Sequence, residues 1–502
     1  MAAFVTDQFR ILNAGSFVES ISNNSYYAFL GLSNPTLPNP GFGRTTNWDT
    51  STTNNPIDNL QYLSHYRDTS LFGRKITAEN ARRVVRRIDW VKNNSFDMYR
   101  HDYGQGNPSP VNKALTLYSA EYYVITDEFK VYICLDNGSS GVSPTIQRST
   151  EKPTHTGTQA AILGDGYKWK YLFTVSPADV IKFDSTEFIV VPNDWATTTD
   201  SDIQIIRDGG NSDSNDNQIQ TVYIENGGDG YQDQPFSADI IGDGTGGIVN
   251  IETTNNKITK VSVTAGGKGY TYGTIDLSGR SGSGSKLIPI IPPSKGHGHD
   301  IYTELGTDKV LLYARFDDST KDFPTDTKFA QVGIIKNPQT FGEGTTFTGN
   351  EFSSLFAIKL TSEVTLNVGE TIEQSVTTNN VTTVAKGYVA SYDKETNIVK
   401  YYQDRSLCFG NKVDQTHNDL TSAIVGFSTA VSSLSTGTID TSFSGSVVTI
   451  NSKQINLGVN FENGLANPEI NKKTGDIIYI DNRPEVQRDS RQKEDVKIIL
   501  EF

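Results

Sequence analysis

The sequence predicts a mainly β protein: a β-sandwich-like core with a few flanking short helices, plus inserted all-β modules. Gly is abundant, at 44 of 502 residues, and Thr, Ser and Asn are frequent. Such a composition is typical of short strands joined by tight turns. Hydrophobic residues make up 35% of the chain, which is enough for real cores and excludes disorder throughout. Long stretches that favour helix are scarce.

The N-terminal part predicts helices around a buried strand. Residues 9–18 have the apolar spacing of a short helix, and the aromatic run from Tyr26 to Leu32 is typical of a buried strand. A second helix is expected over residues 76–87, with Thr77 as its N-cap. Its apolar residues would share one face: Ala81, Val84, Val85 and Ile88.

A β-hairpin and an aromatic strand follow. Residues 122–126 and 130–136 are apolar runs on either side of an Asp-Glu turn. After Gly164, aromatic residues recur at every second position, which predicts one aromatic face of a strand: Tyr167, Trp169, Tyr171 and Phe173. This face could stack on sugars or bases, but core packing is the interpretation we favour.

Further elements are expected on both sides of an internal repeat. Ser176 caps a brief helix, and a strand follows over residues 188–192. Strands are also predicted near the C-terminus and in the second half of the chain: residues 309–316, 329–336, 388–392, 398–402, 476–484 and 496–502.

The internal repeat lies in residues 204–300. Residues 222–231 and 261–270 share the pattern V-x-[IV]-x-x-G-G-x-G-Y at a spacing of 39. A strand that enters a glycine turn with positive φ, anchored by a tyrosine, is what this pattern predicts. We therefore expect a small all-β module of two related units.

Charge and composition exclude several classes of function and partner. The net charge is −14 and the acidic residues are spread out, so a nucleic-acid partner, which needs a positive face, is not expected. Cys134 and Cys408 are far apart and predict buried core residues rather than disulfides or metal ligands. Neither a signal peptide nor an apolar run of about 20 residues is present, so no membrane partner is expected.

Candidate site residues are few. His297 and His299 could face one metal ion if the segment is extended. Metal sites usually need three or four ligands, so a solvated loop is the interpretation we favour. A basic patch could contact an acidic partner or nucleic acid, or simply complement a helix end, which is the interpretation we favour: Arg82, Arg83, Arg86 and Arg87.

Sequence motifs of catalysis are missing. The chain has no P-loop, no Gly-x-Ser-x-Gly elbow and no His-Glu-x-x-His helix, and no carboxylate pair stands out as acid and base. We therefore expect no enzyme, no catalytic residue, no cofactor and no small-molecule substrate.

Several separated stretches carry a resemblance to one family and occur in that family's order, running to the last residue: 4–10, 131–136, 164–173, 187–192, 334–338, 478–484 and 494–502. The segment Arg86-Arg87-Ile88-Asp89-Trp90 is similar to an Arg-Arg-Asp-Trp segment of the same family, with an extra Ile. Together these stretches resemble the dimeric baseplate wedge subunit, gene product eight, of T-even-like contractile-tailed phages.

The resemblance implies a domain map and a function. Residues 1–203, 301–340 and 468–502 would form the family-like wedge core. Residues 204–300 and 341–467 would be inserted modules, in an enlarged layout that resembles versions from contractile-tailed phages (myoviruses) of cyanobacteria, the cyanophages. The resemblance also implies a homodimer that holds neighbouring wedge proteins. It would be located in the virion tail baseplate after assembly in the host cytoplasm.

Two other functions stay open at this point. A trimeric, fibre-like adhesin could bind host glycans through the Gly- and Tyr-rich repeat. A β-sandwich enzyme acting on polysaccharide would need a carboxylate pair in a cleft, which the sequence does not indicate. Which surfaces contact which partners is not predicted.

Overall fold

A computed structural model describes residues 4–31, 55–142, 147–208, 219–317, 328–378, 380–403, 425–487 and 492–502. They form several sheets with few short helices, which confirms the mainly β fold class. The chain divides into two compact units, residues 1–18, 82–311 and 499–502 in the first and residues 19–81 and 312–498 in the second. Residues 204–300 belong to the first unit and 341–467 to the second. The insertion boundaries stay a prediction.

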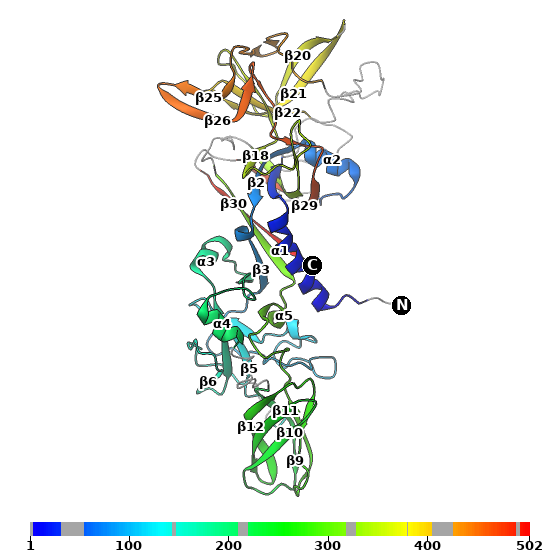
Figure 1. The fold of residues 1–502 in the computed structure, drawn as a ribbon, viewed down its shortest axis with the longest axis vertical. Coiled ribbons are helices and arrows are strands. Elements are labelled where there is room, and N and C mark those ends of the chain that lie inside the picture. The colour runs from blue at the N-terminus through cyan, green and yellow to red at the C-terminus, as the bar shows by residue number, and fades with distance from the viewer. Residues whose placement is uncertain are drawn as a thin grey trace. The chain divides into compact units, whose positions relative to one another are not determined.

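The helices are short, apart from the first. Helix α1 begins where Thr6 accepts the backbone N–H of Phe9 on both its carbonyl and its hydroxyl oxygen, and it includes the predicted residues 9–18. The helices are α1 (Asp7–Asn23), α2 (Leu60–Asp68), α3 (Pro177–Phe183), α4 (Ser201–Asp208) and α5 (Ile301–Leu305), with 3₁₀ turns η1 (Ala78–Asn80) and η2 (Leu117–Ser119) (Figure 1). None of the helices in the described residues is long and apolar enough to cross a membrane.

The body of the first unit is a sheet with the order β4-β5-β7-β6. Its strands are β4 (Tyr123–Ile125), β5 (Lys130–Asp136), β6 (Ala161–Ile162) and β7 (Lys168–Thr174), so the predicted hairpin is confirmed. Core packing is confirmed for three residues of the aromatic stripe, because Tyr167, Trp169 and Phe173 are buried, whereas Tyr171 is only half-buried. Tyr167 stacks on Trp169 with the ring centroids 5.6 Å apart. Cys134 is buried, as predicted, and Cys408 lies outside the described residues.

The prediction of a helix over residues 76–87 is wrong. This segment contains the end of β2 (Ser70–Ile76), the turn η1 and then β3 (Ala81–Arg86), which pairs antiparallel with β8 (Phe188–Val191). Val84 and Val85 face Val190 and Ile189 across the ladder. Because β-branched residues pack well on a pleated sheet, this tertiary pairing overrides the helical spacing. The sheet order is β30-β15-β3-β8, with β15 at Lys309–Phe316 and β30 at Glu494–Glu501.

The repeats build the module of residues 219–291, shown in green in Figure 1. Its strands are β9 (Val222–Asp229), β10 (Phe236–Gly242), β11 (Thr245–Thr254), β12 (Lys257–Lys268), β13 (Gly273–Ile275) and β14 (Ser283–Pro289). β12-β11-β10-β13 form one sheet and β14-β9 the other. The first strand of each copy, β9 or β12, thus pairs with the third strand of the other copy. All of these strands contribute to one aliphatic core.

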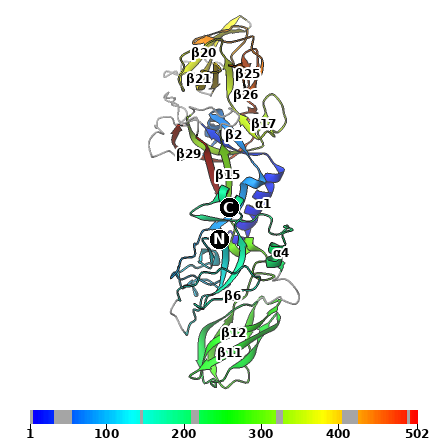
Figure 2. The ribbon, with the colours of Figure 1, turned by 90° about the vertical axis from the view of Figure 1, so that its left-hand side faces the viewer.

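The second unit contains a sheet with the order β18-β2-β1-β16-β29 and a larger one with the order β20-β21-β22-β19-β27-β26-β25 (Figure 2). The first has β1 (Tyr26–Gly31), β2 (Ser70–Ile76), β16 (Lys328–Lys336), β18 (Glu351–Ser353) and β29 (Asp476–Gln487). The second has β19 (Phe356–Lys359), β20 (Thr371–Thr378), β21 (Val381–Asp393), β22 (Ile398–Tyr402), β25 (Gly445–Ile450), β26 (Lys453–Glu462) and β27 (Leu465–Ala466). Short ladders join β17 (Gln339–Thr340) to β28 (Ile470–Asn471), and β23 (Ser433–Leu434) to β24 (Gly437–Thr438). Leu32 lies outside the described residues.

Candidate functional site

The favoured prediction of a solvated loop is wrong for His297, which is buried, and the two histidines considered as metal ligands have separate partners. His297 is buried, and its Nδ1 lies 2.6 Å from Oε1 of the buried Glu304, whose other oxygen accepts the Gly298 N–H at 2.7 Å. The Tyr99 ring packs edge-on against the His297 ring. His299 Nδ1 instead lies 3.3 Å from the Arg207 carbonyl oxygen. Within the described ranges, no group of three or more His, Cys, Asp or Glu side chains could hold a metal ion.

The arginines of the basic patch are engaged inside the first unit. Arg82 Nε donates to Asp179 Oδ1 at 3.0 Å, and the Arg83 guanidinium lies 3.2 Å from the centre of the Tyr302 ring. Arg87 Nη1 donates to Asp184 at 3.1 Å. A guanidinium held on an aromatic face and by carboxylates stabilises the fold. This supports a structural role for the patch rather than a nucleic-acid contact.

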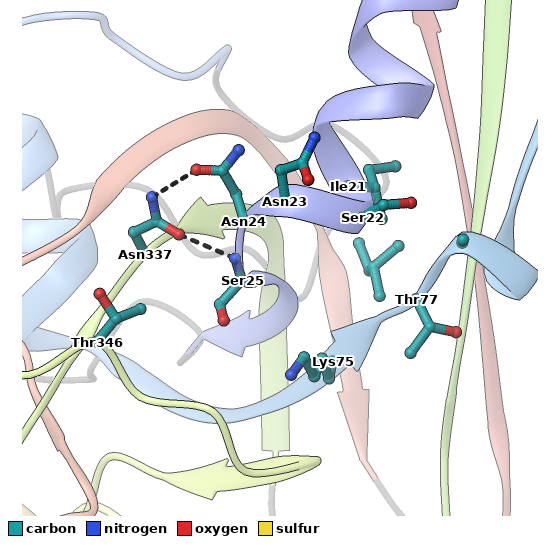
Figure 3. A pocket seen from close by; sticks show the side chains of 11 residues that line it. Ile21, Ser22, Asn23, Asn24, Ser25, Lys75, Thr77, Asn337 and Thr346 are labelled. Atoms are coloured by element: carbon teal, nitrogen blue, oxygen red, sulfur yellow. Dashed lines mark hydrogen bonds between the residues drawn. The ribbon is translucent and has the colours of Figure 1, made fainter.

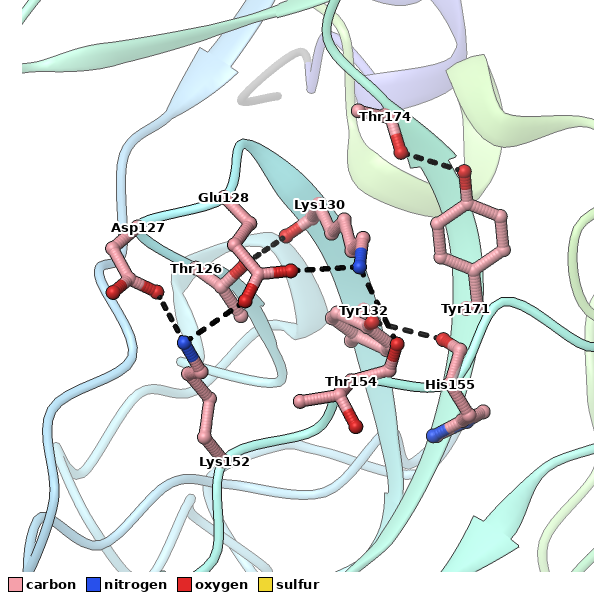
Figure 4. A network of polar contacts seen from close by, with 10 residues as sticks. All are labelled: Thr126, Asp127, Glu128, Lys130, Tyr132, Lys152, Thr154, His155, Tyr171 and Thr174. Atoms are coloured by element: carbon pink, nitrogen blue, oxygen red, sulfur yellow. Dashed lines mark hydrogen bonds and ion pairs between the residues drawn. The ribbon is translucent and has the colours of Figure 1, made fainter.

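A second group of charges ties a loop to the β4–β5 hairpin (Figure 4). Lys152 Nζ donates to Asp127 at 2.7 Å and to Glu128 at 3.2 Å, and Lys130 donates to Glu128 at 2.7 Å. The two lysines hold the pKa of Glu128 below its usual range, and both carboxylates raise the pKa of Lys152. Exposed pairs of this kind add little stability, so the network mainly fixes the position of the loop.

The second unit contains a polar pocket of about 480 Å³ (Figure 3). It lies where the end of α1, the end of β2 and the turn after β16 meet. Asn337, in a left-handed turn with φ of 50°, accepts the Ser25 N–H at 2.9 Å and donates to Asn24 Oδ1 at 2.9 Å. Lys75 reaches the rim and donates to the Thr348 carbonyl oxygen.

The pocket can hold a polar group but shows no catalytic arrangement. Its lining is mostly hydroxyl and amide, with one ammonium: Ile21, Ser22, Asn23, Asn24, Ser25, Lys75, Ile76, Thr77, Ala78, Asn337 and Thr346. A general acid–base pair or an activated nucleophile is not among these residues. Sequence reasoning missed the pocket, because its parts come from segments about 50 to 310 residues apart that only the sheet β2-β1-β16 brings together.

The sequence analysis also did not predict the contacts between the repeat module and the body of the first unit, which we call the joint. The Arg100 guanidinium, held by Asp102 at 2.8 Å, lies 4.0 Å from the centre of the Tyr223 ring. Gly141 donates its N–H to the Ile224 carbonyl oxygen at 2.7 Å, and Lys168 Nζ donates to the Gln220 carbonyl oxygen at 2.7 Å. The module is therefore bonded to the body by both side chains and backbone.

The fold defines the class of a mainly β protein built from several sheets. Residues 125–227 match the model of a family described as Bacteriophage T4, Gp8. The match runs from the last residue of β4 into β9 and so continues beyond residue 203, where the predicted core segment ends. No curated protein matches the chain. The similarity supports a gene product 8-like, structural protein of a phage baseplate wedge, and it is consistent with a protein that is not an enzyme.

Proposed function

We propose that the chain is a homodimeric connector of the baseplate wedge in a contractile phage tail, in an enlarged, cyanophage-like form. It holds neighbouring wedge proteins together during assembly in the host cytoplasm and during sheath contraction. The observation that carries this proposal is the family match over residues 125–227. The order of the other resembling stretches, which continues to the last residue, adds to it.

The chemistry of the chain supports a connector. A connector must keep its shape under load, and the matched segment has the features of a rigid body. Its large rings are buried and stacked, as Tyr167 and Trp169 show. Its charged loop is pinned to the hairpin by Lys152. Interfaces between such rigid surfaces are held by shape and by apolar contacts.

The oligomeric state is the first measurement. Light scattering after size-exclusion chromatography should give twice the mass of the 55.1 kDa chain. Co-expression with neighbouring wedge proteins should then move the chain into a larger complex. A stable trimer would overturn the proposal in favour of the glycan-binding adhesin.

The repeat module, which belongs to the proposed insertion 204–300, has ends that can be joined after its removal. The Ile290 N–H donates to the Thr221 carbonyl oxygen at 3.0 Å, so the two ends of the module are neighbours. Replacing residues 222–289 by two glycines keeps His297 and its contact with Glu304. If the module is a decoration, the shortened chain still folds and dimerises. An unfolded product would show that the module is part of the core.

A further inference from the structure

The segment through which the chain leaves the repeat module has few backbone donors. Its sequence is Pro289-Ile290-Ile291-Pro292-Pro293, and because proline has no backbone N–H, only the two isoleucines can donate. The Ile290 N–H donates to the Thr221 carbonyl oxygen, inside the module. The Ile291 N–H donates to Nδ1 of His101, in the body of the first unit, at 3.2 Å. The single backbone donor that joins this exit segment to the body therefore ends on a histidine nitrogen.

The bond from Ile291 fixes the protonation state of His101. A backbone N–H can only donate, so Nδ1 must carry a free lone pair and the proton of the neutral ring must sit on Nε2. His155, His297 and His299 differ, because their ring nitrogens face oxygen atoms and can donate to them. A second proton preserves those bonds. On His101 it occupies the lone pair that the Ile291 N–H needs.

The charges around His101 come from its own segment. Among the described residues, the charged side chains that act on the ring are Arg100 and Asp102. The exit segment carries no titratable side chain, and β9 contributes Tyr223, whose ring lies under the Arg100 guanidinium. Arg100 is in turn bonded to Asp102. A protonated His101 would therefore repel Arg100 and compete with it for Asp102.

The surroundings of His101 also set the direction of its pH dependence. The residue is exposed, so solvent protons reach it. The protein packed around the ring desolvates the charged form, and this desolvation, together with the Arg100 charge, lowers the pKa of His101 against the opposing effect of Asp102. A histidine with a lowered pKa stabilises the folded contact fully above the unfolded value of about 6.5, and that stabilisation is lost as pH falls through the folded value.

We propose that His101 is a pH switch at the exit of the repeat module. The neutral ring holds Ile291 against the body, and protonation of Nδ1 releases it. The entry side of the module stays attached, because the bond from the Gly141 N–H to the Ile224 carbonyl oxygen involves no group that titrates. Acid thus loosens the module at one end without detaching it. The switch depends on the joint alone and not on the proposed baseplate function.

Residue-resolved hydrogen exchange of the full chain, corrected for intrinsic pH effects, tests the switch. Between about pH 8 and about pH 5, which bracket the usual histidine pKa of about 6.5, the protection of the Ile291 amide should fall about fivefold. The Ile290 amide, bonded to a carbonyl oxygen, is the internal control and should keep its protection. In His101→Asn the side-chain oxygen does not titrate, so the protection of Ile291 should not depend on pH. A flat wild-type response, or a response that persists in His101→Asn, would overturn the inference.

Two further measurements exclude other origins of the response. Nitrogen NMR of the histidine rings near pH 8 should find the proton of His101 on Nε2, and a proton on Nδ1 would overturn the inference. Asp136 of β5 is a competing titratable group, because it pairs with Lys168 of the joint and burial raises the pKa of its carboxyl. Asp136→Asn should keep the response of the Ile291 amide. Loss of the response in this variant would assign it to Asp136 and not to His101.

Discussion

The two copies of the repeat, residues 222–231 and 261–270, have the same local structure but different surroundings. Gly228 and Gly267 have φ of 65° and 63°, and the tyrosines that follow, Tyr231 and Tyr270, are buried. In each copy, a Cβ on this glycine would meet a carbonyl oxygen and an amide nitrogen of the paired strand at 2.5–2.6 Å.

The copies differ in what they contact. The first carries Tyr223, on which Arg100 of the body lies, whereas the position 39 residues later is Ser262. The Tyr231 hydroxyl pairs with Ser285 Oγ, but the Tyr270 hydroxyl bridges the backbone of Ile240 and Gly247. The shared motif thus fixes the glycine turn and the buried tyrosine that follows it. Single side chains decide which copy contacts the body of the first unit.

The largest effect should come from the shared glycines. Gly228→Ala and Gly267→Ala each place a Cβ at positive φ and against backbone atoms that cannot move aside. We expect a loss of about 3 kcal/mol in the stability of the module for either change, because strain and overlap add. Hydrogen exchange of the module's amides in the full chain measures it. Clearly unequal losses would show that the copies are not equivalent.

The contribution of the tyrosine hydroxyl to the stability of the module should differ between the two copies. Tyr270→Phe leaves two buried backbone groups without their partner and should cost about 2 kcal/mol. Tyr231→Phe removes a half-buried pair with Ser285 and should cost about 1 kcal/mol. The same exchange measurement on both variants gives the difference. Equal losses of stability in the two variants would contradict a special role for the hydrogen bonds of the Tyr270 hydroxyl with the backbone of Ile240 and Gly247.

The contact between the repeat module and the body of the first unit should weaken when the first copy receives the residue of the second copy at position 223. Tyr223→Ser removes the ring under Arg100, a contact worth about 1 kcal/mol. The Gly141 amide, which donates to Ile224, should then exchange about fivefold faster. Ser262→Tyr is the matched control and should leave Gly141 unchanged. No change in Tyr223→Ser would mean that the backbone bonds alone hold the joint.

The smallest effect is a pH dependence confined to the second copy. Asp243 accepts a hydrogen bond from the Thr271 hydroxyl and from the N–H groups of Thr271 and Tyr272, and these donors, the hydroxyl above all, lower the pKa of its carboxyl. A lowered pKa in the folded state means that the stabilisation is present above the unfolded value of about 3.9 and is lost as pH falls through the folded value.

At the corresponding place opposite the first copy stands Ser281, whose hydroxyl donates to the Gly230 carbonyl oxygen and does not titrate in this range. Exchange of the Thr271 and Tyr272 amides, corrected for intrinsic pH effects, should therefore rise as pH falls below about 3.9, and that of Tyr231 should not. Asp243→Asn keeps an acceptor and should remove the response. A response that persists in this variant would assign it to another group.

Local patterns were sufficient for much of the fold. The hairpin of β4 and β5, the cap of α3 at Ser176 and the buried tyrosines of the repeat follow from turn residues, capping chemistry and alternation, all of which act over a few residues. For residues 81–86, local patterns gave the wrong element, a helix in place of the strand β3. Their spacing suits a helix as well as a strand, and only Val190 and Ile189 on a strand about 100 residues later settle the choice.

The sequence by itself determined the mainly β class, the duplicated glycine–tyrosine unit and the resemblance to a baseplate family, because composition and short motifs constrain backbone conformation directly. Only the tertiary structure decided that each copy's first strand pairs with the third strand of the other, that Arg100 docks on Tyr223, and that distant asparagines and Lys75 line one pocket. These features join segments far apart in the chain. Their stability comes from contacts between surfaces, and surfaces exist only after the strands have paired.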